Sequence, residues 1–380
     1  MKHGDTENTE KSLLEFVFSV LSVSPCCNTV FSPTFPVPIK TSSLAVSAHR
    51  AGQYRTSLPM KLLIVIVNYK TADLTIDCLR SLADQISAVP DARVVITDNA
   101  SNDGSPEKIA AAINQNHWTW AEVKPLDTNG GFAFGNNRGI EPALKSDHPD
   151  YIYLLNPDTL VLPDALKELV AFMDEHPEVG IAGNRVINPD GSVRNSTFRF
   201  PAPLSELESA IRLGFVTRLL RNSVVAEPPP EKPARVDWVS GASMIIRREV
   251  FEKIGLLDDK YFMYYEETDF CLRAAKAGQP TWYVPSSKIV HIVGQASGVT
   301  GTKKNAKRRP RYWFDSRHRF FRTHYGACKT LAADLMWAGG FSVHNILRTL
   351  RGKPRTDPPW LLYDFVRYSI SSYFASLKLL

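Results

Sequence analysis

The sequence has few cysteines, no long apolar run and no strong excess of charge. Its 380 residues include five cysteines, Cys26, Cys27, Cys78, Cys271 and Cys328, with no C-x-x-C pair. This odd number argues against a disulfide framework or a zinc site, so we expect the protein to reside in a reducing cytoplasm. No apolar run approaches the roughly 20 residues that a membrane-spanning helix needs. The net charge of +6 is small for this length and demands no polyanionic partner.

Residues 1–59 differ in composition from the rest of the chain. They are rich in Ser, Thr and Pro without hydrophobic periodicity, so we predict a disordered extension. Residues 12–24 imitate the apolar part of a signal peptide, but Glu15 interrupts it and several acids precede it. Both features argue against secretion. Met60 could be the true start of the protein.

From Leu62 onward, apolar strands alternate with amphipathic helices. The run Leu-Leu-Ile-Val-Ile-Val at 62–67 is typical of a central parallel strand covered on both faces. Further strands are expected at 93–98, 121–126 and 151–155, and helices at about 73–85, 105–114, 132–144 and 163–176. This alternation predicts an α/β fold with a doubly wound, mostly parallel sheet flanked by helices.

Polar residues follow the predicted strands, at the point where each strand ends. In a doubly wound sheet, ligands bind beyond the carboxyl ends of the strands. Four polar clusters fall there: Asn68 with Tyr69, Asp98 with Asn99, residues 127–131, and Asn156 to Asp158. We therefore expect these clusters to converge on one crevice.

Two of the clusters suggest nucleotide recognition. Asp98 could accept a hydrogen bond from a base N–H or a ribose hydroxyl while Asp103 and Gly104 turn the chain. A turn with a helix cap is the alternative. The glycine-rich segment 129–139 could cradle a phosphate, or its glycines could let a helix pack closely. It matches neither G-x-G-x-x-G nor a P-loop, so both interpretations stay open.

Oxygen and imidazole side chains suggest a cation site. Asn156 and Asp158 lie two positions apart on extended chain and can address one Mg²⁺ or Mn²⁺, which often takes one or two protein carboxylates and completes its shell with phosphate and water. The alternative is a turn capped by Asp158. His291 follows an apolar strand and could also face the crevice, although a lone histidine is more often structural.

Five acids lie within 12 residues, beside a run of aromatic residues at 261–265. They are Asp258, Asp259, Glu266, Glu267 and Asp269. Carboxyl groups crowded against aromatic rings should have a raised pKa, which suits a general base. The alternative is an N-terminal cap for a helix at 267–277, where acids favour the helix dipole.

Together these segments resemble the inverting GT-A-fold glycosyltransferases of family 2, particularly bacterial rhamnosyltransferase-like members, over about residues 61–325. The resemblance rests on the order of the motifs as well as on their content. The matching segments are Ile66-Val-Asn-Tyr69, Asp98 to Ser105, Asn129 to Gly139, Asn156-Pro-Asp158, Trp238-Val-Ser-Gly-Ala242, Gly255-Leu-Leu-Asp-Asp259, Glu266-Glu267 and His291.

The resemblance implies a role for each matching residue. It implies a GT-A domain over residues 60–300, with a nucleotide-sugar half at 60–190 and an acceptor and catalytic half at 235–300. The donor would be bound by Asn68, Tyr69, Asp98, Asn99, Gly131, Asn136, Asn156 and Gly241, and the acceptor by Trp238, Asp259 and Asp269. Asp158 and His291 would hold Mg²⁺ or Mn²⁺. Glu266 and Glu267 match a catalytic Glu-Asp pair, with Glu267 as the expected base and Glu266 as the alternative.

The function so implied is metal-dependent transfer of a sugar from a nucleotide-diphosphate donor to a hydroxyl of a glycan or lipid-linked acceptor. Rhamnose is the sugar suggested at the level of the family, in the synthesis of a cell-surface polysaccharide. A catalytically silent protein of the same fold that binds a nucleotide sugar or a polyanion is the alternative. The sequence is compatible with a homo-oligomer.

Residues 301–380 are expected to form a basic segment and a helical tail. Residues 303–322 hold nine Lys and Arg side chains among aromatic residues, which could contact donor phosphates, an anionic membrane surface on the cytoplasmic side, or solvent. Nucleic acid ranks below these targets. Leu362, Val366 and Ile370 recur at helical spacing, so this stripe should pack on the domain or lie on a membrane.

Overall fold

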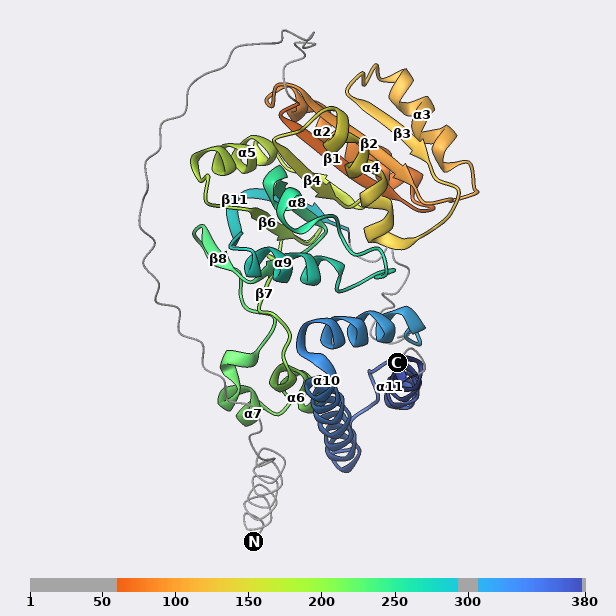
Figure 1. The fold of residues 1–380 in the computed structure, drawn as a ribbon, viewed down its shortest axis with the longest axis vertical. Helices are drawn as coiled ribbons and strands as arrows, with labels where there is room; N and C mark the ends of the chain where they lie inside the picture. The colour runs from red at the N-terminus through yellow and green to blue at the C-terminus, as the bar shows by residue number, and fades with distance from the viewer. Residues whose placement is uncertain (1–59, 293–306, 378–380) are drawn as a thin grey trace, which may run out of the picture. The chain divides into compact units, whose positions relative to one another are not determined.

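The computed structural model describes residues 60–292 and 307–377, which belong to one compact unit. The predicted extension at 1–59 lies outside the described residues, as do Lys303 and Lys304 of the basic segment. An α/β part contains the sheet and its covering helices, and a C-terminal helical region packs beside it (Figure 1). The structure confirms the predicted α/β class and the C-terminal helical extension. Among the described residues, no helix has the length and apolar character needed to cross a bilayer.

The strands form a mixed sheet in which most strands run in one direction. In the described residues it has nine strands in the order β3-β2-β1-β4-β10-β6-β11-β5, with β8 beside β11. The strands are β1 (Leu62–Asn68), β2 (Ala92–Asp98), β3 (Ala121–Pro125), β4 (Tyr151–Leu155), β5 (Thr159–Val161), β6 (Ile181–Ile187), β8 (Ala234–Val236), β10 (Ser243–Arg247) and β11 (Thr281–His291). Only β5, β8 and β10 oppose the others within these residues. β7 (Thr197–Phe198) and β9 (Trp238–Val239) form a separate pair.

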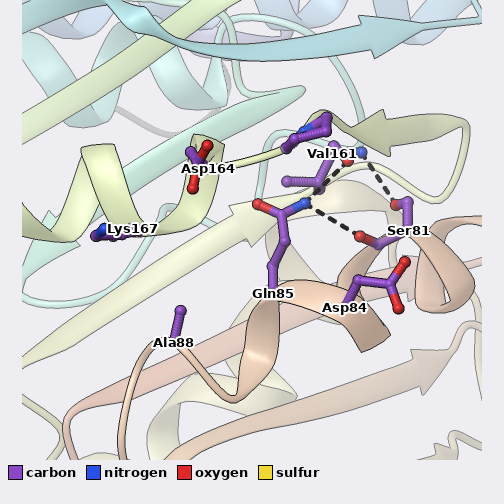
Figure 2. Close-up of a pocket in the computed structure, with 8 residues that line it drawn as sticks. Ser81, Asp84, Gln85, Ala88, Val161, Asp164 and Lys167 are labelled. Atoms are coloured by element: carbon purple, nitrogen blue, oxygen red, sulfur yellow. Dashed lines mark hydrogen bonds between the residues drawn. The ribbon is translucent and has the colours of Figure 1, made fainter.

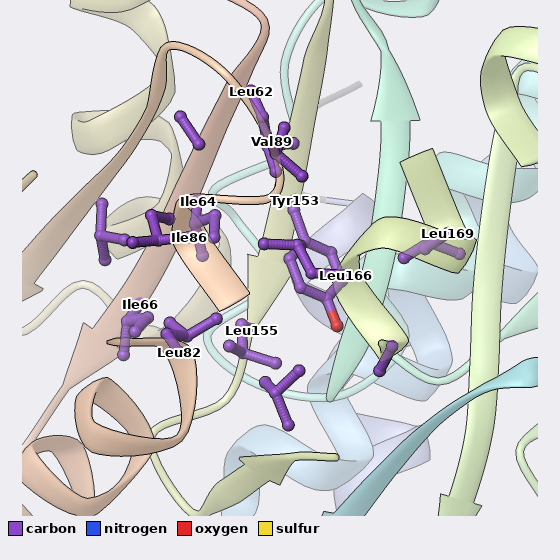
Figure 3. Close-up of a cluster of buried hydrophobic side chains, with 14 of the residues drawn as sticks. Leu62, Ile64, Ile66, Leu82, Ile86, Val89, Tyr153, Leu155, Leu166 and Leu169 are labelled. Carbon is purple, nitrogen blue, oxygen red and sulfur yellow. The ribbon is translucent and has the colours of Figure 1, made fainter. Parts of the chain in front are cut away.

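The helices α2 (Ala72–Ile86), α3 (Ser105–Gln115) and α5 (Ala165–Glu175) cover one face of the sheet. The other face is covered by α4 (Gly131–Ser146), α8 (Arg248–Ile254) and α9 (Glu266–Lys276). Every residue of β1 is buried, because alternate side chains of a strand point to opposite faces and both are covered. Figure 3 shows one of these faces, where Leu62, Ile64 and Ile66 pack against α2.

The C-terminal helical region consists of α6 (Pro203–Ile211), α7 (Gly214–Leu219), a short 3-10 helix at Arg221–Ser223, α10 (Arg311–Leu350) and α11 (Leu361–Leu377). Gly326 interrupts α10 with φ 76° and ψ 178°, a conformation that is essentially restricted to glycine. The buried guanidinium of Arg317 joins these helices, because it pairs with Glu206 on α6 and with Asp334 beyond the break in α10.

The predicted tail stripe packs on the domain only in part. In α11, Leu361 and Phe365 are buried against α10, and Leu362 of the predicted stripe packs beside them. Val366 and Ile370 of the stripe are exposed. Both alternatives for the stripe therefore stay predictions.

The close contact between α4 and β1 gives the first prediction. A Cβ on Gly139 would lie 2.8 Å from Cγ1 of Val65, whereas nothing lies within 4 Å of a Cβ on Gly339 in α10. We expect Gly139→Ala to lower the free energy of unfolding by about 1–3 kcal/mol through overpacking. Gly339→Ala, the matched control, should raise it by about 0.5–1 kcal/mol. Urea denaturation measures both, and equal effects would contradict the packing argument.

Candidate active site

The predicted polar clusters lie at one edge of the sheet. Strands β2, β1 and β4 are adjacent and parallel, with Asn68 opposite Asp98 and Ile66 opposite Leu155. Asn156 follows β4 directly, and its backbone N–H donates to the carbonyl of Ala242, just before β10. The segments containing Asn68, Asp98, Asn156 and Gly241 therefore come together, although they are far apart in the sequence.

Asp98 is held in a buried hydrogen-bond network of its own. Its Oδ2 accepts from Asn68 Nδ2 at 2.5 Å and from Ser101 Oγ at 2.6 Å, while its Oδ1 accepts from the Ser101 backbone N–H at 2.9 Å. Asn68 Oδ1 in turn accepts from two threonine hydroxyls on the following turn. This geometry matches the alternative interpretation, in which Asp98 stabilises a turn. Contact of Asp98 with a nucleotide-sugar donor stays a prediction.

The glycine-rich segment packs closely against its surroundings. Gly131 has φ +90°, and a Cβ there would collide with the backbone of Phe262. Its carbonyl accepts from Asn99 Nδ2 at 2.8 Å, and the next backbone N–H, of Phe132, donates to the Phe262 carbonyl at 2.9 Å. Asn136 is buried and donates back to the Phe132 carbonyl. The segment thus fixes α4 on the sheet and ties its first turn to Phe262, in the chain just before Glu266 and Glu267.

Asp158 and His291 lie side by side. After β4 the chain turns into β5, which pairs with the end of β11 so that Thr159 lies opposite His291. His291 Nε2 then stands 3.1 Å from Asp158 Oδ1. The two side chains offer one oxygen and one nitrogen at one place. In the described residues no group of three or more acidic, histidine or cysteine side chains could hold a metal.

Glu266 begins α9 as a buried residue, and Glu267 follows it half-buried. Tyr264 and Tyr265 precede them with positive φ angles of 72° and 69°, which non-glycine residues rarely adopt. Each glutamate has one buried oxygen without a hydrogen-bond partner among the described residues. Burial raises the pKa of Glu266 well above its ordinary value, and the neighbouring Glu267 raises it further. Burial also raises the pKa of Glu267, while N–H groups including that of Gly241 oppose the shift.

A pocket of about 290 Å³ opens beside Glu267. The sheet part contributes Trp238, Glu267 and Thr268, together with the two tyrosines that precede α9. The helical region contributes Ser205, Glu206 and Ser209 of α6 and Trp313 of α10. Trp238 is fixed by stacking on Phe198, with ring centroids 4.2 Å apart. The pocket therefore combines a carboxyl group of raised pKa with aromatic walls.

The pocket is lined by residues that the motifs did not identify. Glu206 and Trp313 belong to segments without a catalytic motif, and Trp313 is one of the aromatic residues of the basic segment. A signal for Glu206 was present in hindsight, since it is an acid on the apolar face of a helix. Asp98, Asp158 and His291 are not among the residues that line this pocket.

Gly241 connects the pocket with the sheet edge. A Cβ on Gly241 would lie 3.5 Å from both the Glu267 Cβ and the Phe132 ring, and the next residue, Ala242, is bonded to Asn156. A continuous chain of contacts therefore joins Glu267 to the segment that bears Asp158.

Three predicted site residues lie outside this arrangement. Asp259 is exposed. Asp269 is buried and committed to Arg273 and His324, each at 2.7 Å. Tyr69 is 39% exposed, with the Lys70 ammonium over its ring. Their predicted contacts with donor or acceptor stay predictions.

The basic segment is largely neutralised. Arg308 pairs with Asp364, Arg311 with Asp315, and Arg319 with Asp258. Arg317 is the most deeply buried of them, at 2% exposure. The described part of this segment therefore serves mainly to attach the C-terminal helices, and is not a continuous free basic surface.

A second hollow, of about 300 Å³, lies between α2 and α5 (Figure 2). Gln85 Nε2 donates to the carbonyls of Ser81 and Val161, and Ser81 Oγ accepts from the Val161 backbone N–H. These polar groups stabilise the junction between α2 and β5. None of the predicted site residues lines this hollow.

Comparison with known proteins identifies similar sequences. The model of the family described as Glycosyl transferase family 2 matches residues 63–255. The chain is 30% identical over 215 residues to an N-acetylglucosaminyl-diphospho-decaprenol L-rhamnosyltransferase of Mycobacterium tuberculosis, covering 54% of this chain and 68% of the relative. It is also 30% identical over 217 residues to the low-salt glycan biosynthesis hexosyltransferase Agl10 of Haloferax volcanii, covering 56% of this chain and 61% of the relative.

Among solved structures, a mannosyltransferase from Pyrobaculum calidifontis, in complex with GDP-Man and Mn²⁺, is similar with a TM-score of 0.47 and 15% identity. The similarity covers 86% of this chain and 82% of that chain.

The buried carboxyl of Glu266 predicts a pH-dependent stability. An acid whose pKa is raised in the folded state stabilises that state while protonated, and this contribution is lost as pH rises through the raised pKa. Glutamine stays neutral. Above neutral pH, we therefore expect Glu266→Gln to have a higher melting temperature than the wild type. Its free energy of unfolding should be larger by about 1–3 kcal/mol.

The difference in stability should shrink as the pH falls and close below about 4, where the wild-type carboxyl becomes protonated in the unfolded state as well, because the ordinary pKa of glutamate is about 4.3. Calorimetry of both proteins at a series of pH values measures this difference in stability. The exposed Glu175→Gln is the control and should show no such gap. A Glu266→Gln variant that is less stable than the wild type at high pH would contradict the argument.

Proposed function

This chain belongs to glycosyl transferase family 2, and from that premise we propose that it moves a sugar from a nucleotide-diphosphate donor to a hydroxyl of a glycan or lipid-linked acceptor. As a member of the family it is a glycosyltransferase, an enzyme of class EC 2.4. The observation that carries the finer proposal is Glu267, a carboxyl of raised pKa at the wall of an aromatic pocket.

The pocket beside Glu267 suits an acceptor sugar. Sugar rings present C–H groups on their faces and hydroxyls on their edges, so aromatic walls such as Trp238 and Trp313 can cover the faces. The hydroxyls of Ser205, Ser209 and Thr268 can bond the edges. Of the two adjacent acids, Glu267 lines the pocket whereas Glu266 is not among its lining residues, which supports Glu267 as the base.

The proposed reaction is a single displacement. The Glu267 carboxylate takes the proton of the acceptor hydroxyl, and the oxygen so freed attacks the anomeric carbon. The bond from that carbon to the diphosphate oxygen breaks on the opposite side, and the nucleoside diphosphate leaves with the electron pair. The configuration at the anomeric carbon inverts. The Gly241 N–H opposes the rise in the pKa of Glu267 and so favours the ionised form that the proposed reaction needs.

Asp158 and His291 fit a divalent cation that is completed by substrate. Their oxygen and nitrogen converge at 3.1 Å, and Mg²⁺ or Mn²⁺ commonly takes few protein ligands when substrate phosphates supply the rest. An imidazole in the set suits Mn²⁺ better than Mg²⁺. When bound, the cation would neutralise the negative charge of the leaving diphosphate.

The donor sugar is proposed by similarity. The Mycobacterium tuberculosis relative is named an L-rhamnosyltransferase. Relatives of Escherichia coli and Shigella flexneri, at 27% and 24% identity, are named a rhamnosyltransferase and a dTDP-rhamnosyl transferase. The Haloferax volcanii relative is named a hexosyltransferase of glycan biosynthesis. Rhamnose transfer in the synthesis of a polysaccharide is therefore the specific form of the proposal.

The base gives a prediction on activity. We expect Glu267→Gln to lower kcat by about 10²–10⁴-fold, the usual contribution of a general base, because glutamine cannot take the acceptor proton. Release of nucleoside diphosphate in the presence of acceptor measures turnover. In the wild type the rate should fall with decreasing pH at a value above about 4.3, the ordinary pKa of glutamate, since only the ionised form is a base.

Glu266→Gln separates the two candidates for the base. It keeps the size and position of the neighbouring side chain and should retain more activity than Glu267→Gln. A lower activity in Glu266→Gln than in Glu267→Gln would instead assign the role of catalytic base to Glu266. Unchanged turnover in Glu267→Gln would remove this mechanism and favour the catalytically silent alternative.

The cation site gives a prediction on binding, independent of turnover. A nucleoside diphosphate should raise the melting temperature of the wild type more with Mn²⁺ than without it, because both bind the folded state. Asp158→Asn should lose the Mn²⁺-dependent part of this shift and keep the metal-free part. Comparing UDP, GDP and dTDP in this assay would also identify the nucleobase that the protein prefers. An undiminished Mn²⁺ effect in Asp158→Asn would place the cation elsewhere.

A further inference from the structure

A row of exposed apolar side chains runs along the second half of α10. Leu331, Leu335, Ile346 and Leu350 are 48%, 64%, 59% and 78% exposed. With Gly339 and Ser342 between them, they are spaced by three or four residues and share one face of the helix. We call this face the α10 stripe. Its 20 residues extend for about 30 Å at the helical rise.

The opposite face of the same helix is occupied by protein. Ala333, Trp337 and Phe341 are buried, and Trp337 stacks on Phe365 of α11 with ring centroids 4.1 Å apart. Gly340 lies against α6. The face that carries the α10 stripe is therefore the exposed one, and large apolar side chains gathered on one exposed face mark an interaction surface.

Positive charge borders the α10 stripe at both ends. Lys329 precedes it, and Arg351, Lys353 and Arg355 follow it on an exposed turn. None of these four forms an ion pair within the described residues. The sequence has no Asp or Glu from Leu335 to Thr356, and Asp334 is buried against Arg317. The surface is thus apolar along its length and cationic at its borders.

We propose that the α10 stripe and the basic turn after it dock the enzyme on an anionic lipid bilayer, with the leucine and isoleucine side chains in the interface and the basic groups at the lipid headgroups. An amphipathic helix lies in the plane of a bilayer when one face is apolar and cations flank it. Each Lys or Arg near an anionic surface adds to the attraction.

Charge argues against a second copy of this chain as the occupant. A two-fold interface brings the same patch of both subunits together. Whether two α10 helices pack parallel or antiparallel, basic borders would face basic borders without a compensating acid. A nucleic acid would satisfy the cations but would leave the aliphatic row unused, because nucleic acids are bound by aromatic stacking and polar groups.

The surface belongs to the element that also builds the pocket. The first half of α10 contributes Trp313 to the pocket beside Glu267, and the second half carries the α10 stripe. Docking on a bilayer would therefore hold the proposed active site close to acceptors that are anchored in that bilayer. The docking itself does not depend on the proposed chemistry.

Sedimentation with vesicles tests the docking. The full chain should sediment with phosphatidylcholine vesicles that contain phosphatidylglycerol, far less with phosphatidylcholine alone, and less as salt increases. The triple variant Arg351→Glu, Lys353→Glu, Arg355→Glu should lower the partition coefficient on the anionic vesicles by about a hundredfold or more. The matched control, Lys167→Glu, Lys232→Glu, Lys253→Glu, changes net charge equally at exposed positions and should retain most of the binding.

A second set of variants tests the apolar contribution. Leu335→Gln, Ile346→Gln and Leu350→Gln together should lower the partition by about tenfold or more while the circular dichroism spectrum and melting curve stay unchanged, because these side chains are exposed. The control makes the same change at Tyr363, Val366 and Ile370, the exposed row of α11, and should bind as the wild type does.

Three results would overturn the proposal. The first is equal sedimentation with neutral and anionic vesicles; the second is loss of binding in the α11 control but not in the α10 variant. The third is a change from dimer to monomer in the α10 variant with lipid binding intact, which would make the stripe a contact between copies. Glu267→Gln should sediment like the wild type, so failure of the docking and failure of the chemistry can be distinguished.

Discussion

The buried guanidinium of Arg317 is the interaction on which the two-part architecture depends. It pairs with Glu206 of α6 and Asp334 of α10, and lies 4.8 Å from the ring centroids of both Phe321 and Phe365. A buried charge is tolerated only when it is paired and hydrogen-bonded. One side chain thus fixes α6, both halves of α10 and α11 in a single arrangement. Since α6 and α10 form one wall of the pocket, this ion cluster also holds that wall together.

The two sets of buried acid groups in this protein differ in whether a cation pairs with them. Glu206 and Asp334 share an arginine, and burial still raises the pKa of Glu206 against the pull of that cation. Glu266 and Glu267 have no cation beside them, and each keeps a buried oxygen without a partner in the described residues. A buried carboxyl group without a cation or a full set of hydrogen bonds is poorly suited to stabilise a fold but well suited to remove a proton. The contrast between the paired and unpaired acids supports assigning structure to the first set and chemistry to the second.

Much of the α/β part could be predicted from sequence, because its signals are local. The apolar run of β1 and the helices around it follow from periodicity, and Asp158 with His291 followed from placing polar residues at strand ends. The antiparallel β10 and the walls of the pocket could not be predicted. Glu206 and Trp313 meet through tertiary packing of segments about 100 residues apart, and no local pattern encodes this. The pairing of Arg317 and Arg319 with distant carboxyls could not be predicted for the same reason, because it cannot be read from their neighbours in the sequence.

The break at Gly326 has a consequence for how the protein can vary. The chain before it is constrained by Trp313 and Arg317, and the chain after it by contacts with α6 and α11. Because the two stretches are not one continuous rod, residues can be exchanged in the outer stretch without changing the register of the inner one. Substitutions in the outer stretch can therefore alter the α10 stripe without moving Trp313 at the pocket, provided that this position remains glycine.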